Sequence, residues 1–329
     1  MPDFFKLRHE TTNNRPGSLL PDSDIFIAHG NYTIQGQRVT CDFVLETKAR
    51  ENDVQFLSTK LNSESLKDIN DGLLPVLGYR QPPYNQPDGT KIFQLVIQLQ
   101  PGLERSSLSH WICTEPALSL LERLRLCSKL ACAIQTVHSI GLVHKSLHPR
   151  SVLILSEAGM PKSSGTAYLQ DWTFIRELSG ATTQIGEDLW PKRIYQHPER
   201  QGKYADAAYE PKHDIYSLGV CMLEVLLWKP FVVTDPTSNG QTLRICQLFE
   251  SYGLARGEQD GGLPLRYQGD SAKLAGRPRA TKTIWEDIAA RELKDQDLTQ
   301  LVLECLGSSF QTAKDVVRQL KVLIEARTP

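Results

Sequence analysis

The chain has 329 residues, 40% of them hydrophobic, which is enough to bury an independent core. Its 37 Lys and Arg against 38 Asp and Glu leave a net charge of −1, which excludes the global basic field of a nucleic-acid-binding protein. Seven scattered cysteines without metal-ligand spacing predict reduced core thiols. Neither a signal peptide nor an apolar run long enough to cross a bilayer is found, so we expect a cytoplasmic protein without a membrane span.

The N-terminal part predicts a tail followed by a small, mainly β lobe. Residues 1–28 are polar and are interpreted as a tail or linker. Residues 29–102 form the predicted lobe, which has one short helix at 53–61. Its strands are expected at 25–27, at the edge of the tail, and at 32–34, 39–46, 73–79 and 93–99.

After Gln100-Pro101-Gly102 the pattern changes to helix, and residues 103–329 predict a larger, mainly α lobe. Ser119 and Glu122 form a capping box at the start of a helix that Gly141 ends. A hairpin is expected over 152–155 and 167–170, and a helix at 214–228 is apolar nearly all round, which predicts the buried spine of the lobe. Residues 255–282 are interpreted as a mobile insertion. Thr283 with Glu286 predicts a second capping box, followed by helices at 284–293, 298–306 and 313–326.

The stretch from Leu142 to Ile154, LVHKSLHPRSVLI, lies between a predicted helix and a predicted strand. It resembles the catalytic loop of the eukaryotic protein kinases, H-R-D-L-x-x-x-N followed by an apolar strand. Further anchors follow in the order found in that family: Asp171 in the D-F-G position, Glu199 in a His-Pro-Glu that resembles A-P-E, and Asp214 in a D-x-x-S-x-G. The resemblance implies a bilobal α+β kinase fold in which His144, Glu199 and Asp214 are structural.

A narrower resemblance rests on three sequence segments, FVLETK at 43–48, LVHKS at 142–146 and HDIYSLGV at 213–220. They are similar to the kinase-like C-terminal domains of fungal proteins, which often carry an N-terminal prion-inhibition (HeLo-type) cell-death domain. The similarity covers about residues 30–329, so the effector domain itself is not expected within this chain. It implies a signalling role through protein partners that the sequence does not identify.

The catalytic loop lacks the family's reacting side chains. The Asp that accepts the substrate proton is replaced by Ser146, the metal-binding Asn by Ser151, and the loop Lys by His148. A hydroxyl is far too weak a base at neutral pH to substitute for the Asp. These three positions are therefore interpreted as degenerate, with no intact catalytic residue.

Two residues could still bind a nucleotide and its metal. Asp171 occupies the place of the magnesium carboxylate, although an Asp that begins a surface turn would look the same. Lys48 is the best candidate for the strand lysine that contacts the phosphates, although a solvated lysine at a strand end is an equal interpretation. Gly30 and Gly36 make a poor Gly-rich loop and are better explained as part of a strand turn. No helix glutamate is clearly placed to pair with Lys48.

The sequence therefore predicts a pseudokinase, a kinase-fold binding and signalling module without phosphotransferase activity, whose working surface includes residues 174–196. ATP and Mg²⁺ are the cofactors that it could retain. One alternative is a weak or unconventional protein kinase that uses Asp171, one metal ion and a displaced base. A small-molecule phosphotransferase on a related fold is a third hypothesis, weakened because it needs the same missing Asp and Asn.

Overall fold

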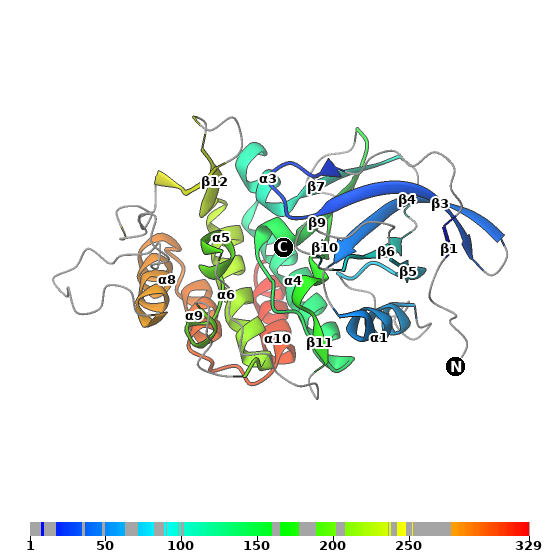
Figure 1. Cartoon of the computed structure of the whole chain (residues 1–329). Coiled ribbons are helices and arrows are strands. Elements are labelled where there is room, and N and C mark those ends of the chain that lie inside the picture. The colour runs from blue at the N-terminus through cyan, green and yellow to red at the C-terminus, as the bar shows by residue number, and fades with distance from the viewer. Residues whose placement is uncertain are drawn as a thin grey trace. The chain divides into compact units, whose positions relative to one another are not determined.

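The computed structural model describes residues 8–9, 18–34, 37–47, 50–62, 72–81, 89, 91–97, 99, 102–159, 165–177, 189–201, 208–235, 237, 242–247, 252 and 278–328 (Figure 1). The chain divides into two compact units. Unit 1 comprises Met1–Trp111 and Thr136–Ser179, and unit 2 comprises Ile112–Gln135 and Gly180–Pro329. The predicted lobe boundary at residue 102 does not coincide with this division, and the two-lobe organisation stays a proposal.

Unit 1 contains a six-stranded antiparallel sheet with the strand order β1-β3-β4-β6-β5, and β2 pairs with β3 outside this order. Its strands are β1 (Arg8–His9), β2 (Ser18–Leu19), β3 (Phe26–Ile34), β4 (Gln37–Thr47), β5 (Gly78–Arg80) and β6 (Phe93–Ile97). Helix α1 (Glu51–Leu61) lies beside β5 and β6 and buries Val54, Leu57 and Leu61, which recur at helical spacing. The sheet strands and the helix follow the predicted order.

The rest of unit 1 builds the frame of the kinase-like loop. Strands β7 (Leu103–Ser107), β9 (Val152–Glu157) and β10 (Thr166–Leu169) form a second antiparallel sheet in the order β10-β9-β7. Strand β8 (Leu142–Val143) pairs with β11 (Arg176–Glu177). Two 3₁₀ turns, η1 (Pro149–Ser151) and η3 (Trp172–Phe174), lie after β8 and β10. The predicted hairpin of β9 and β10 is therefore confirmed.

Unit 2 is mainly helical and is organised around α6 (Pro211–Leu227), in which every residue from 213 to 226 is buried. Helix α9 (Gln296–Leu306) packs against α6, α8 (Pro278–Glu292) and α10 (Ala313–Glu325). Helices α3 (Leu108–Thr114) and α4 (Leu120–Ser139) each include residues of both units. The remaining elements of unit 2 are α5 (Trp190–Arg193), η4 (Pro198–Arg200), β12 (Val232–Thr234) and β13 (Leu243–Ile245). The prediction of a buried spine helix is confirmed.

Local signals explain where several helices begin and end. The predicted capping box at α4 is present, because Ser119 Oγ and N both donate to Glu122 Oε2 and Glu122 N donates to Ser119 Oγ. Gly141 adopts a φ of 82°, a left-handed conformation that suits glycine, just after α4. At α6, Pro211 occupies the first turn and the Glu210 N–H donates to His213 Nδ1 at 2.9 Å.

Five expectations need correction. Residues 18–28 are not a free tail, because β2 and the start of β3 belong to the sheet and Ser107 Oγ donates to the carbonyls of Pro21 and Asp22. Residues 103–107 are a strand, β7, rather than the start of helix, and 73–77 lie outside any strand. Helix α8 begins at Pro278, a residue suited to the first helical turn, so Thr283 lies inside the helix instead of capping it. Residues 278–282 of the predicted insertion are therefore helical, and residues 255–277 lie outside the described residues.

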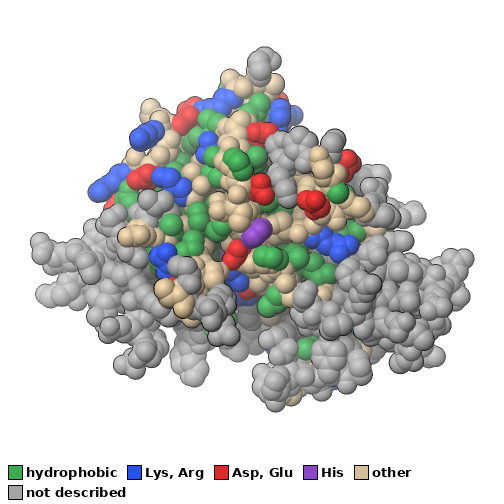
Figure 2. Space-filling view, turned by 90° about the horizontal axis from the view of Figure 1, so that it is seen from above, with side chains coloured by type: hydrophobic (Ala, Val, Ile, Leu, Met, Phe, Trp, Pro, Cys, Tyr) green, Lys and Arg blue, Asp and Glu red, His purple; other side chains and the backbone are tan. Residues whose placement is uncertain are grey.

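The protein has the predicted α+β class, with strands concentrated in the N-terminal part and helices in the C-terminal part. Among the described residues, no helix combines the length and apolar character needed to cross a bilayer. On the face seen in Figure 2, basic and acidic side chains both lie among apolar ones, and neither sign covers the part drawn in colour.

Candidate functional site

The catalytic-like loop of unit 1 is held by a buried histidine. His144 is fully buried, and its Nδ1 accepts a 3.3 Å hydrogen bond from the backbone N–H of Ser146. A backbone N–H can only donate, so Nδ1 carries no proton and Nε2 must carry it, donating at 2.8 Å to the carbonyl of Gln170. The His144 ring also meets the Trp172 ring edge-on at 4.9 Å. The neutral imidazole thus ties the loop to the segment that follows β10.

Asp171 is held through both carboxylate oxygens by hydroxyl donors. Ser146 Oγ donates to Asp171 Oδ2 at 2.6 Å, and Thr173 Oγ1 donates to Oδ1 at 2.6 Å. The Asp171 side chain is 4% exposed, and its backbone is left-handed with a φ of 61°, which Asp tolerates better than most residues. The residue is therefore a buried, oriented carboxylate and not a surface Asp at the start of a turn.

Ser151 is engaged by the backbone of its own turn. Its Oγ accepts from the His148 N–H at 3.1 Å and donates to the His148 carbonyl at 2.7 Å, which closes η1. Ser151 is fully buried, and the single hydroxyl proton is committed to this bond. A hydroxyl committed in this way does not replace the metal-binding amide of the family.

His148 lies close to Asp24, an acidic residue that the sequence did not place in the site. Its side chain is 1% exposed, and its Nε2 lies 3.7 Å from Asp171 Oδ2 and 3.7 Å from Asp24 Oδ2. Asp24 belongs to the segment before β3, where its N–H donates to the Arg150 carbonyl at 3.1 Å. Arg150 Nη2 in turn lies 3.3 Å from Asp24 Oδ1. Sequence reasoning missed both Asp24 and Arg150, because no local pattern marks a contact over 126 residues.

The residues present do not fit the pair of magnesium ions that a protein kinase uses. Asp171 keeps its carboxylate, but the second magnesium-binding position is occupied by Ser151, whose hydroxyl is hydrogen-bonded to the backbone of η1 and its preceding residue. Lys48 lies outside the described residues, as does Gly36. Gly30 lies within β3 opposite Cys41, at a shift of register, and only positions 35 and 36 separate β3 from β4. A kinase also pairs its strand lysine with a helix glutamate, and the acidic residues in the first turn of α1 are Glu51 and Asp53.

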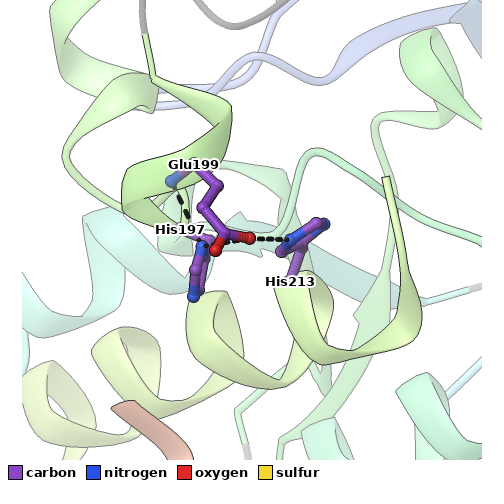
Figure 3. A group of neighbouring side chains, drawn as sticks. All are labelled: His197, Glu199 and His213. Atoms are coloured by element: carbon purple, nitrogen blue, oxygen red, sulfur yellow. Dashed lines mark hydrogen bonds and ion pairs between the residues drawn. The ribbon is translucent and has the colours of Figure 1, made fainter. Parts of the chain in front are cut away.

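A second cluster lies in unit 2, where Glu199 of η4 meets two histidines (Figure 3). His213 Nε2 lies 3.3 Å from Glu199 Oε2, and His197 Nδ1 accepts from the Glu199 N–H at 3.2 Å. Since His213 Nδ1 accepts the Glu210 N–H, its proton is on Nε2, which donates to the Glu199 carboxylate. With both Nδ1 atoms accepting backbone protons, the arrangement fits a hydrogen-bonded support better than a metal site.

Burial shifts the titration of this second cluster. Burial, followed by the charge of His213, lowers the pKa of His197 to about 4. Burial also lowers the pKa of His213. Partial burial opposes the shift at Glu199, but the His213 hydrogen bond and nearby positive charges hold its pKa below the ordinary value. Both histidines are therefore neutral in the folded protein at neutral pH.

Asp214 is fully buried at the start of α6, and its Oδ1 accepts a 2.6 Å hydrogen bond from the Tyr209 hydroxyl. Burial, reinforced by this carboxylate, raises the pKa of Tyr209 well above its ordinary value. The structure thus brings Ser146, His148, Ser151 and Asp171 together in unit 1, and places Glu199 and Asp214 in unit 2.

Comparisons with known proteins agree with the resemblance of the sequence to the protein kinases. A family model described as protein tyrosine and serine/threonine kinase matches residues 57–244, more than half of the chain. The matched range includes the catalytic-like loop, Asp171, Glu199 and Asp214, and begins after Lys48. The α+β kinase fold predicted from the sequence is confirmed.

Three relatives illustrate the range of similar proteins. A probable cell division protein kinase of Encephalitozoon cuniculi is 31% identical over 127 residues, 39% of this chain and 36% of that protein. A probable serine/threonine-protein kinase PknB of Lactococcus lactis is 21% identical over 204 residues, 61% of this chain and 29% of that protein. A probable inactive serine/threonine-protein kinase of Dictyostelium discoideum is 32% identical over 111 residues, 33% of this chain and 9% of that protein. The matches thus span well under half the length of these relatives.

Proposed function

The chain belongs to the protein tyrosine and serine/threonine kinase family, and we propose that it acts as a pseudokinase, a binding and signalling module that lacks phosphotransferase activity. The observation that carries the proposal is the hydrogen bond from Ser146 to Asp171. At the position of the catalytic base stands a hydroxyl that gives its proton to a carboxylate, and it cannot take the proton of a substrate. Loss of a positioned base costs about 10²- to 10⁴-fold in rate.

Other features of the site support the same proposal. Ser151 serves η1, and His148 replaces the loop lysine that steadies the transferred phosphate. The close spacing of β3 and β4 leaves at most two residues for a loop over the phosphates. Each of these differences removes a group that phosphoryl transfer uses. Their effects on the rate are not additive, because the groups act together in one reaction.

The module would then work through its surfaces. The resemblance implies that residues 174–196 form the activation segment, and we propose them as a contact region for protein partners. Residues 178–188 of this range lie outside the described part of the chain. The resemblance to kinase-like domains of fungal prion-inhibition proteins supports a role in signalling. One relative of the chain is itself named a probable inactive serine/threonine-protein kinase, which agrees with the proposed lack of activity.

The test is a phosphate-transfer assay on the purified protein with ATP and Mg²⁺, run beside Asp171→Ala. We expect no transfer above the background of the variant. Transfer that disappears in Asp171→Ala would overturn the proposal in favour of an unconventional kinase that uses the retained carboxylate.

A thermal-shift titration with ATP, with and without Mg²⁺, separates binding from catalysis. A ligand that binds the folded state at 100 times its Kd stabilises it by about 2.7 kcal/mol. A magnesium-dependent shift that is lost in both Lys48→Ala and Asp171→Ala identifies a nucleotide-responsive pseudokinase. The absence of a shift at millimolar ATP identifies a module that works by protein contacts alone.

A further inference from the structure

We propose that Asp24, His148 and Asp171 form a binding site for a divalent transition-metal ion of the Zn²⁺ type, and that this ion fastens the segment before β3 to the catalytic-like loop. Their ligand atoms all lie within 4.8 Å of one another. The site is distinct from a kinase magnesium site, because two of its three ligands, Asp24 and His148, lie at positions that the kinase family does not use for magnesium. It does not depend on whether the protein transfers phosphate.

The distances leave room for a shared ion. His148 Nε2 is 3.7 Å from Asp24 Oδ2 and 3.7 Å from Asp171 Oδ2, beyond the 2.7–3.2 Å range of N–H···O hydrogen bonds. Two ligands bound at 2.0–2.2 Å around a tetrahedral Zn²⁺ are separated by about 3.3–3.6 Å. A shift of a few tenths of an ångström would bring Nε2 to this separation from each carboxylate oxygen, and the three ligand atoms already lie within 4.8 Å of one another.

Hydrogen bonds orient both carboxylates. In Asp171, Oδ1 accepts from Thr173 Oγ1, while Oδ2 accepts from Ser146 Oγ and faces His148 with its remaining lone pair. In Asp24, Oδ1 lies against the Arg150 guanidinium, while Oδ2 faces His148. Hydrogen bonds that fix one oxygen and direct the other are the usual support of a metal-ligating carboxylate.

The backbone holds Asp24 in place before any ion binds. Its N–H donates to the Arg150 carbonyl, and Ser23 Oγ donates to the same carbonyl at 3.2 Å. The Asp24 side chain is 26% exposed, whereas those of His148 and Asp171 are 1% and 4% exposed. The site therefore has one preorganised ligand at the surface and two buried ones.

The donor set selects the class of ion. One imidazole nitrogen and two carboxylate oxygens suit Zn²⁺, whereas Mg²⁺ prefers oxygen ligands in an octahedron and retains several waters. Three protein ligands leave the fourth position of a tetrahedral ion open. Binding there links Asp24 to His148 and Asp171, so the ion should stabilise the segment from Ser18 to Ile25.

The experiment is calorimetric titration of the chelator-treated full chain with ZnCl₂, and separately with MgCl₂. We expect one Zn²⁺ per chain, with affinity reduced about tenfold or more in Asp24→Asn and in His148→Gln. The matched control is Asp22→Asn, in the same segment, whose Oδ2 lies 2.9 Å from His110 Nδ1 rather than at the proposed site. It should bind Zn²⁺ as the unmodified chain does.

Hydrogen exchange provides the second readout. Zn²⁺ should slow exchange of the Asp24 amide in the unmodified chain and leave it unchanged in His148→Gln, while thermal melting establishes that each variant is folded. The proposal is overturned if the unmodified chain binds no Zn²⁺, if Asp24→Asn binds it undiminished, or if binding leaves exchange of residues 18–25 unaltered. Binding of Mg²⁺ in preference to Zn²⁺ would overturn it as well.

Discussion

Ser146 gives its hydroxyl proton to Asp171 in a 2.6 Å hydrogen bond between the two positions where the kinase family has its base and its metal carboxylate. Ser146 is 1% exposed and the Asp171 side chain 4%, so the bond is shielded from water. A hydrogen bond to a charged group contributes about 1.5–3 kcal/mol. The serine is thus a structural partner of Asp171, and replacing it by the Asp of the family is expected to change the stability of the protein.

We predict that Ser146→Asp lowers the melting temperature. The substitution removes the hydroxyl donor and places a second carboxylate beside Asp171 in a buried site, where like charges repel strongly. Thermal melting at pH 7 measures the effect. The matched control is Ser146→Asn, which has the same size as Asp without its charge and should be closer to the unmodified chain.

We also predict that Ser146→Asp combined with Ser151→Asn does not restore phosphate transfer. Restoring these two side chains would not supply a Gly-rich loop, since β3 and β4 are joined by at most two residues. It would also not supply the helix glutamate that pairs with a strand lysine in the family, because the acidic residues of α1 lie in its first turn. Phosphate transfer by the double variant, in a folded protein, would contradict this view of the sheet.

The sequence predicted the elements that local patterns specify. The order of Ser146 and Asp171 in the chain resembled that of a kinase site, and the hairpin β9–β10, whose two strands are adjacent in sequence, returns the chain to the loop. Capping at Ser119 and the apolar pattern of α6 are similarly local signals. Lys48 could not be placed, because it lies outside the described residues.

The part that the sequence could not predict depends on distant contacts. Asp24 reaches the site through hydrogen bonds to Arg150, and the polar composition of residues 1–28 indicated a tail instead. Polar side chains can fix a segment as well as apolar burial does when the folded chain supplies partners, as Ser107 does for Pro21 and Asp22. Such partners have no periodic signature.

Asp214→Ala is predicted to be more destabilising than Ser146→Ala. The Asp214 carboxylate is fully buried, and its loss removes a hydrogen bond to a charged group, as Ser146→Ala does, but also strands the buried Tyr209 hydroxyl at a further cost of about 1–3 kcal/mol. Ser146→Ala leaves Asp171 the bond from Thr173. Chemical denaturation compares the two, with Tyr209→Phe as the control that removes only the hydroxyl. Equal unfolding free energies would contradict the ranking.

Gly219→Ala should destabilise the chain because α6 and α9 approach closely at this position. A Cβ added at Gly219 would lie 2.6 Å from the Cβ of Cys305, which belongs to the helix body and cannot rotate away. Overpacking of a core costs about 1–3 kcal/mol. In a double-mutant cycle, the cost should be smaller in a Cys305→Gly background, which removes the opposing Cβ. Identical costs in both backgrounds would exclude this contact as the cause.

The last prediction concerns pH and the cluster of His197, Glu199 and His213. Burial lowers the pKa of His197 to about 4 and also lowers that of His213, whereas histidines of the unfolded chain titrate near 6.5. Between these values the unfolded state binds more protons, so the histidine contribution to stability is complete above pH 6.5 and is lost as pH falls toward 4. Glu199, whose pKa is also lowered, adds a loss in the same direction at lower pH.

A comparison with His197→Asn isolates this effect from other titrating groups. Burial raises the pKa of Glu224 to about 8, so this carboxyl opposes the histidines, because the folded state binds the extra proton between the ordinary value and about 8. It is present in both proteins and cancels in the difference. Asn keeps a side-chain acceptor for the Glu199 N–H without titrating, so melting temperatures measured from pH 7.5 to 5 should fall less in the variant. Parallel profiles would show that His197 does not take up the proton on unfolding.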